Sequence, residues 1–187
     1  AVGPGIGIDN DDWQKSQDYL IGFEGLLILD ADALNRISES KLGSKFFLER
    51  KFKTWITPHI KEFLRLFPDI ESETYVGLAL KAAKEFNISV LLKGANSVIA
   101  DNKKAWQLFG TDSQTARAGL GDLLSGFVAG SSAIDLTFSR NITTEFFAKY
   151  VLLHSFAASK CKTGSNASAI GDELSKLMRN GKTRQIS

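Results

Sequence analysis

The chain has 187 residues, enough for a domain with a sizeable hydrophobic core. Hydrophobic residues make up 43% and charged residues 24% of it, as in an average soluble globular protein. The net charge of +2 is too small to indicate a nucleic-acid or anionic-membrane partner, and the one cysteine, Cys161, excludes an internal disulfide framework and cysteine-rich zinc sites. Cys161 is most simply a reduced thiol, so we expect a cytoplasmic protein. No membrane-spanning run or signal peptide is visible in the sequence.

The start of the chain is unusual, because Ala1-Val2 leads directly into Gly3-Pro4-Gly5-Ile6-Gly7 without an initiator methionine. This pattern is typical of the last step of a strand that enters a tight loop. We therefore expect that the N-terminal part of the domain is missing, and we assign residues 1–187 to a single domain. The acidic run Asp9–Asp12 is expected to provide helix caps and solvated surface.

Apolar runs and helical periodicity alternate along the rest of the chain. Short apolar runs predict strands at Gly25–Asp30, Trp55–Thr57 and Ile88–Lys93, with Ser97–Ala100 able to pair beside the last as a hairpin. Helices are predicted at Thr74–Phe86 (with Val76, Leu80 and Ala83 on one face), Gly121–Ser131 and Thr143–Lys160. This alternation predicts an α/β fold with a mostly parallel central sheet and helices on both faces.

Glycine-rich and polar clusters fall where these strands end, and one more precedes the helix at Gly121. Ligands of such sheets bind beyond the carboxyl ends of the strands, so the clusters could converge on one cleft. The five clusters are Gly3–Gly7, Asp30–Asn35, Thr57–Glu62, Lys93–Ser97 and Ala118–Asp122.

Asp122 is the most informative acid in the chain, because glycines precede it and an apolar helical run follows. It is therefore predicted to lie at a helix N-terminus, where unpaired N–H groups suit phosphate oxygens. A carboxylate there can cap the helix, or it can take a proton from a substrate hydroxyl while the N–H groups stabilise a transferring phosphoryl group.

The other clusters also allow two interpretations each. Gly3–Gly7 lacks the Gly-x-Gly-x-x-Gly spacing of a Rossmann site, and it is either a simple turn or a backbone that approaches a ligand closely. Asp30 and Asp32 could hold Mg²⁺ through water or cap the next helix, and we favour capping for at least one of them. Lys93–Ser97 could bind phosphate or form a hairpin turn with a surface lysine.

Two histidines are present. His59 lies at a predicted strand end, which makes it the better candidate for a site, although a lone histidine is commonly a packed or surface residue. His154 lies in an apolar helix and is interpreted as structural.

Taken in order, these clusters resemble the motifs of the ADP/ATP-dependent NAD(P)H-hydrate dehydratases, a family of the ribokinase-like superfamily. The resemblance runs from Gly3 to about Leu174. The matching segments are Gly3-Pro4-Gly5-Ile6-Gly7, Asp30-Ala31-Asp32-Ala33-Leu34-Asn35, Thr57-Pro58-His59, Leu92-Lys93-Gly94-Ala95 and Gly119-Leu120-Gly121-Asp122-Leu123-Leu124-Ser125-Gly126.

The resemblance implies a ribokinase-like, three-layer α/β/α fold and a repair enzyme for hydrated NADH and NADPH. A nucleotide phosphoryl group goes onto the added hydroxyl, and elimination of phosphate restores the nicotinamide. Mg²⁺ and a donor, ADP or ATP with ADP favoured, are the implied cofactors. By analogy with the family, Asp122 is the catalytic base.

The resemblance also assigns the binding residues. The substrate-binding residues are Gly5, His59 and Asp122. The nucleotide-binding residues are Lys93, Gly94, Ala95, Asn96, Ser97, Gly119 and Gly121. No metal ligand is assigned.

Two departures from the family pattern stand beside these residues. Arg117 replaces a small residue before the Gly-x-Gly-Asp motif, where it could add a charge clamp or alter nucleotide choice. Ile60-Lys61 replaces Pro-Gly next to His59, which changes that wall of the site.

Alternatives remain open. One is a ribokinase-like kinase of a small vitamin precursor such as hydroxyethylthiazole, and another is a nucleotide-binding module without turnover. The resemblance implies a homo-oligomer. Family members often carry a fused N-terminal epimerase domain, which interconverts the two epimers of the hydrate, and the start of this chain is compatible with such a fusion.

Overall fold

The computed structural model describes residues 1–7, 13–109, 119–139, 141–162 and 164–183, with side chains described as far as Arg179. These residues form two compact units, Ala1–Gln107 and Leu108–Ser187. Each unit has a cluster of buried apolar residues of its own. The assignment of residues 1–187 to a single domain stays a prediction. Asp9–Asp12 and Arg117 lie outside the described residues.

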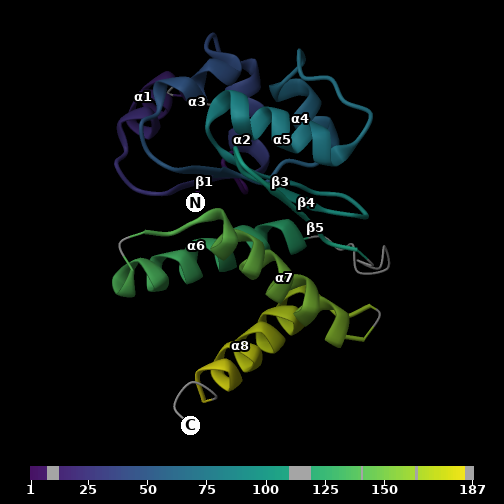
Figure 1. Cartoon of the computed structure of the whole chain (residues 1–187). Helices are drawn as coiled ribbons and strands as arrows, with labels where there is room; N and C mark the ends of the chain where they lie inside the picture. The colour runs from purple at the N-terminus through teal and green to yellow at the C-terminus, as the bar shows by residue number, and fades with distance from the viewer. Residues whose placement is uncertain (8–12, 110–118, 140, 163, 184–187) are drawn as a thin grey trace. The chain divides into compact units, whose positions relative to one another are not determined.

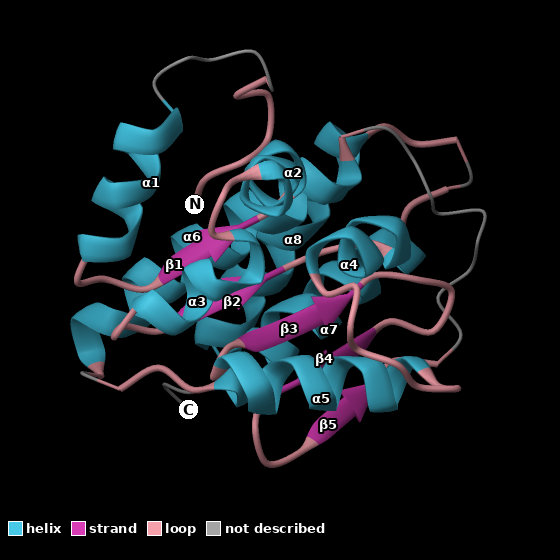
Figure 2. Ribbon diagram, turned by 90° about the horizontal axis from the view of Figure 1, so that it is seen from above, coloured by secondary structure: helices cyan, strands magenta, loops and turns pink. Residues whose placement is uncertain are grey.

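The first unit contains a five-stranded sheet and its helices (Figures 1 and 2). The strands lie in the order β1-β2-β3-β4-β5, of which β1, β2 and β3 are parallel and β4 and β5 follow as antiparallel neighbours. The sheet is therefore mixed, and the hairpin predicted for Ser97–Ala100 is confirmed. In chain order the elements are α1 (Trp13–Gly22), β1 (Leu27–Leu29), α2 (Ala31–Glu39), the 3₁₀ helix η1 (Gly43–Lys45), α3 (Phe46–Glu49), β2 (Thr54–Ile56), α4 (Ile60–Leu66), α5 (Tyr75–Phe86), β3 (Ser89–Leu92), β4 (Val98–Ala100) and β5 (Ala105–Gln107).

The core of the first unit lies between the sheet and the helices α2, α4 and α5, which cover one of its faces (Figure 1). Alternate strand residues such as Leu29, Ile56 and Leu92 belong to this core. Their neighbours on the other face are also apolar, as in sheets that are covered on both sides. These neighbours are Ile28, Trp55, Leu91 and Ile99.

Helix α5 begins where the sequence predicts, because the Thr74 side chain accepts a hydrogen bond from the Gly77 N–H and caps the helix. It ends at Asn87, whose φ of 51° is left-handed. The predicted apolar face was partly wrong. Leu78, Ala82 and Phe86 are among its buried residues, whereas Val76 and Leu80 are half-buried. The buried face includes the predicted Ala83 and is centred one position nearer the N-terminus, on Ala79, Ala82 and Phe86.

The second unit is helical. It contains α6 (Leu120–Phe138), α7 (Thr144–Lys160) and α8 (Ala167–Thr183). The two helices predicted here are confirmed, and α6 continues two turns beyond the predicted end at Ser131. Its buried cluster is formed by Ala157, Ala158, Ile170 and Leu174. Among the described helices, none combines the length and the hydropathy needed to cross a bilayer.

Candidate functional site

Four of the five predicted clusters meet at the carboxyl end of the parallel strands of the first unit. Val2 bridges Leu29 at the end of β1, which brings the Gly3–Gly7 loop beside Asp30. His59 follows β2 and bridges Lys93, which follows β3. A backbone hydrogen bond also joins these two segments, because the Lys93 N–H donates to the Pro58 carbonyl over 2.8 Å. The structure therefore confirms that these four clusters lie at one edge of the sheet, and their convergence on one cleft stays a prediction.

The Gly3–Gly7 loop is held in place by α2. The Gly7 N–H donates to Asp32 Oδ2 over 2.9 Å, and Arg36 donates from Nη2 to the Ile6 carbonyl over 3.2 Å and from Nε to the Gly7 carbonyl. The buried Arg36 guanidinium also lies over the Trp13 ring at 5.3 Å. These hydrogen bonds thus hold the backbone of the loop, and no sequence pattern indicated the contribution of Arg36.

The close contact between the Gly3–Gly7 loop and the end of β1 requires glycine at position 3. Its φ is +141°, and a Cβ atom there would lie 1.7 Å from the Asp30 carbonyl oxygen. A side chain would therefore separate the loop from β1. Gly5 has a φ of +72° with open space where its Cβ would be, so its exposed backbone is accessible.

Asp30 and Lys93 form an ion pair that joins the ends of β1 and β3. Lys93 Nζ lies 2.8 Å from Asp30 Oδ1, and the Asp30 side chain is only 2% exposed. The same oxygen accepts the Ala31 N–H and caps α2, so the capping interpretation is confirmed for Asp30. A charge that is buried to this degree needs such partners.

These contacts also concern the predicted binding of Mg²⁺ by Asp30 and Asp32. Asp30 Oδ1 accepts from two donors and Asp32 Oδ2 accepts from one, which assigns these oxygens to holding the local structure. Among the described residues, no group of three His, Cys, Asp or Glu side chains is placed to hold a metal ion. Mg²⁺ in phosphoryl-transfer sites is commonly held by substrate phosphates with one or two carboxylates, so a nucleotide could bring most of its ligands.

His59 caps α4. Its Nδ1 accepts the N–H groups of Lys61 and Glu62 at 3.1 and 3.2 Å, and the Glu62 carboxylate in turn accepts the His59 N–H at 2.9 Å. This reciprocal pair is a capping box with histidine in the place of serine. The imidazole is 49% exposed, which keeps one edge accessible to a ligand. Because Lys61 contributes only its backbone to the cap, the departure from the family pattern leaves the cap intact.

The Lys93–Ser97 segment forms a tight turn between β3 and β4. Ser97 Oγ donates to the Gly94 carbonyl at 3.1 Å and accepts the Gly94 N–H at 3.3 Å. Ala95 and Asn96 are exposed at its tip. A Cβ on Gly94 would lie 2.9 Å from the Tyr75 ring, so the glycine lets the turn pass close to α5.

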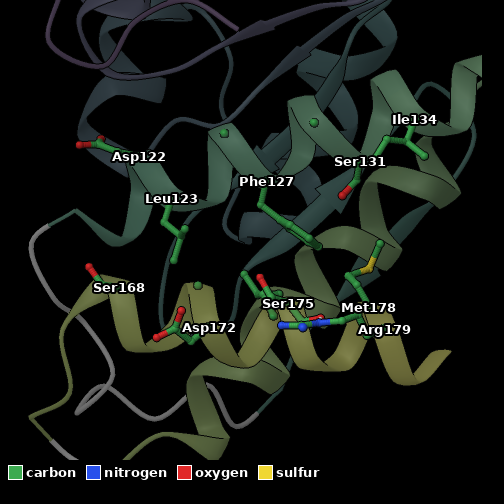
Figure 3. Close-up of a pocket in the computed structure, with 14 residues that line it drawn as sticks. Asp122, Leu123, Phe127, Ser131, Ile134, Ser168, Asp172, Ser175, Met178 and Arg179 are labelled. Carbon is green, nitrogen blue, oxygen red and sulfur yellow. The ribbon is translucent and has the colours of Figure 1, made fainter. Parts of the chain in front are cut away.

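The fifth cluster begins α6 in the second unit. Gly119, with a φ of +78°, is the N-cap residue, and Asp122 is the acid of the first turn. The predicted helix start is therefore confirmed, and the exposed Asp122 carboxylate projects away from Leu123 and Phe127 (Figure 3). Ala118, the first residue of this predicted cluster, lies outside the described residues.

A groove of about 1020 Å³ extends from Asp122 along α6 and α8 (Figure 3). Its walls are mainly apolar, and two exposed glycines of α6 open into it. Its lining residues are Asp122, Leu123, Gly126, Phe127, Gly130, Ser131, Ile134, Ser168, Gly171, Asp172, Leu174, Ser175, Met178 and Arg179.

His154 has the surroundings of a structural residue, in agreement with its interpretation from sequence. It is 6% exposed in α7, and its Nε2 has no hydrogen-bond partner among the described residues. Burial lowers the pKa of the imidazole to about 4, and a hydrogen bond with the backbone of Leu120 opposes this shift only in part. The ring is therefore neutral near pH 7.

Comparison with known proteins extends over most of the chain. A family model described as NAD(P)H-hydrate dehydratase matches residues 1–179. The bifunctional NAD(P)H-hydrate repair enzyme Nnr of Synechocystis is 37% identical over 131 residues, which are 70% of this chain and 24% of that enzyme. The chain thus spans about a quarter of the length of this relative.

Solved structures show the same fold. The ADP/ATP-dependent NAD(P)H-hydrate dehydratase of Bacillus subtilis, co-crystallised with ATP and Mg²⁺, matches with a TM-score of 0.74 and 22% identity, over 96% of this chain and 63% of that one. A ribokinase-like superfamily protein of Enterococcus faecalis matches with a TM-score of 0.78 and 23% identity, over 96% and 62%. The expected ribokinase-like fold is therefore confirmed.

Proposed function

Because this chain belongs to the NAD(P)H-hydrate dehydratase family, we propose that it provides the nucleotide-dependent dehydration of hydrated NADH and NADPH. The observation that carries the proposal is the family match over residues 1–179, which includes all five site clusters. Since the chain spans only part of its relatives, we assign the activity to the polypeptide that contains it.

In the proposed reaction, the added hydroxyl attacks the terminal phosphorus of the nucleotide. A bond from oxygen to phosphorus forms, the bond from phosphorus to the nucleotide breaks, and Asp122 takes the hydroxyl proton. Inorganic phosphate then leaves with the carbon–oxygen bonding electrons. Loss of a proton from the neighbouring ring carbon restores the double bond.

Each cluster has a part in this proposal. The N–H groups near Gly119 and Gly121 would stabilise the transferring phosphoryl group at the start of α6, where the helix dipole favours negative charge. The Lys93–Ser97 turn would contact the nucleotide, and Gly5 and His59 the hydrated cofactor. Mg²⁺, when bound with the phosphates, would supply charge neutralisation.

The Bacillus subtilis relative was co-crystallised with ATP and Mg²⁺, which supports a nucleotide with Mg²⁺ as the donor for this chain. We keep ADP as the preferred donor, together with a homo-oligomeric state and a place in the cytoplasm, as parts of the proposal. The relatives described as bifunctional support a second activity on the same polypeptide, for which we propose the epimerase.

The deciding experiment supplies hydrated NADH with ADP or ATP and Mg²⁺ and follows the absorbance of the restored dihydronicotinamide. Restoration that requires nucleotide would support the proposal. Accumulation of a phosphorylated product without elimination would indicate a small-molecule kinase. Nucleotide binding without any turnover would indicate a binding module.

A further inference from the structure

We propose that Tyr75, the first residue of α5, is the side chain on which the heterocyclic base of the nucleotide stacks. The inference rests on the proposed function, because the Lys93–Ser97 turn is the segment that would contact the nucleotide. It adds an aromatic wall from a second element to that turn. The ligand class is a nucleoside diphosphate or triphosphate, since a phosphate chain alone has no ring to stack.

The first support is the position of the Tyr75 ring beside the turn. A Cβ atom on Gly94 would lie 2.9 Å from Cε2 and 3.6 Å from Cδ2 of this ring. The ring therefore lies against the backbone of the turn, next to the residue that follows Lys93. A nucleotide held by this turn would have an aromatic side chain within reach of its base.

The second support is that the Tyr75 side chain remains accessible. It is 38% exposed. Among the residues that the structure describes, no other ring and no cation stacks on it. Proteins commonly bind nucleobases by stacking them on accessible aromatic side chains, because every base has a π-face. Tyr75 thus offers such a surface at the edge of the sheet where the nucleotide is proposed to bind.

The third support is that the backbone on both sides of the contact is held by hydrogen bonds. Thr74 Oγ1 accepts the Gly77 N–H at 3.0 Å and fixes the start of α5, which carries Tyr75. Ser97 Oγ bonds to both the N–H and the carbonyl of Gly94 and fixes the turn. Binding a base here would therefore order few additional groups, which lowers the entropic cost of association.

The test compares two ligands of the polypeptide that contains this chain. One is ATP with Mg²⁺, and the other is inorganic tripolyphosphate with Mg²⁺, which carries the phosphates without a base. Tyr75→Ala should weaken ATP binding by about 10- to 100-fold, the usual effect of removing a stacked ring, and should leave tripolyphosphate binding within about twofold. Titration calorimetry measures both affinities.

Two further variants test whether the aromatic ring itself is required. Tyr75→Leu keeps an apolar side chain against Gly94 and should lose ATP affinity as Tyr75→Ala does. Tyr75→Phe keeps the ring and should bind ATP as the parent does. A purely structural contribution to the turn would not separate the leucine variant from the phenylalanine variant in this way.

Phe52→Ala is the matched control. Phe52 has a similar exposed fraction of 39%, and it precedes β2 at the amino end of that strand, which is the opposite edge of the sheet from the turn. Its replacement removes an equally accessible aromatic side chain and should leave both affinities unchanged.

Three results would overturn the inference. The first is an equal loss of ATP and tripolyphosphate in Tyr75→Ala, which would show that the ring only supports the turn. The second is an ATP affinity that Tyr75→Ala leaves unchanged, and the third is a parent polypeptide that does not bind ATP. The expected effects on ATP binding without restoration of hydrated NADH would contradict only the proposed dehydration.

Discussion

Asp122 and His154 are ionisable side chains of the same unit in opposite surroundings. Asp122 is exposed in the first turn of α6, whereas His154 is buried in α7 and kept neutral by burial. An exposed carboxylate can exchange a proton with a ligand, whereas a buried neutral imidazole contributes to the packing of the core. The two residues therefore call for different measurements, one of turnover and one of stability.

Replacing Asp122 by asparagine is expected to preserve nucleotide affinity and reduce turnover by about 10²–10⁴-fold in the active polypeptide, the usual effect of removing a general base. Steady-state restoration of hydrated NADH measures turnover, and a binding titration measures nucleotide affinity. Asp69→Asn, at an exposed acid outside the site clusters and the groove, is the matched control and should retain activity. Turnover within a few-fold of the parent would exclude the proposed base.

The buried His154 predicts acid-sensitive stability. Its folded-state pKa of about 4 lies below the ordinary value of 6.5, so the unfolded chain takes up the proton first as the pH falls. The contribution of this histidine to the free energy of unfolding should therefore be fully present above pH 6.5. It should decline as the pH falls toward 4, by up to about 3 kcal/mol. Denaturant titrations across this range should show a flatter profile for His154→Leu. An identical profile would contradict the assignment.

At the scale of elements, the buried Arg50 side chain connects the loop after α1 to the start of β2 in the first unit. Arg50 donates to the Thr54 hydroxyl at 2.9 Å and to the carbonyls of Phe23 and Gly25 at 3.0 and 3.1 Å. It also donates to the Leu20 carbonyl at the end of α1. The loop that leads from α1 into β1 is thereby held against the start of β2.

Arg50→Met should lower the free energy of unfolding by about 2–4 kcal/mol, because two buried and several part-buried acceptors lose their donor. Chemical denaturation measures the change. The neighbouring exposed residue offers a control, since Lys51→Met should alter stability by no more than about 0.5 kcal/mol. Equal effects of the two substitutions would show that the Arg50 contacts contribute little.

Elements with a strong local signal were predictable from the sequence. The strands β1 to β3 are continuous apolar runs, and α5 has a capping threonine before an apolar repeat. Weakly patterned elements were missed. Helix α1 is mostly polar, and the short strand β5 has two half-buried residues and one exposed residue, so neither stands out from its surroundings.

The candidate site was predictable in its location but not in its contacts. Strand ends gave the convergence of four clusters, and the glycines before Asp122 gave the start of α6. The pairing of Asp30 with Lys93 joins residues 63 positions apart, and Arg50 reaches carbonyls 25 to 30 positions away. Sequence spacing carries no information on such contacts, which depend on the register of the sheet.

At the scale of the molecule, the division of the chain into two units predicts where a protease cleaves it first. Phe109, just beyond the boundary at Gln107, is 77% exposed and outside any helix or strand. Phe138 is more exposed, at 87%, but belongs to α6. Proteases need an extended backbone, so limited chymotrypsin digestion should cut first after Phe109 and leave one fragment per unit. Phe109→Ser should delay this cut, and initial cleavage at Phe138 would contradict the prediction.

The ion pair between Lys93 and Asp30 has a consequence for anion selection. The ammonium group is already balanced by a carboxylate, so a polyphosphate that reaches this edge of the sheet would meet little uncompensated positive charge. Attraction between net charges is what dissolved salt weakens most. Recognition here would therefore vary little with ionic strength, and the arrangement of main-chain donors would distinguish one phosphate ester from another.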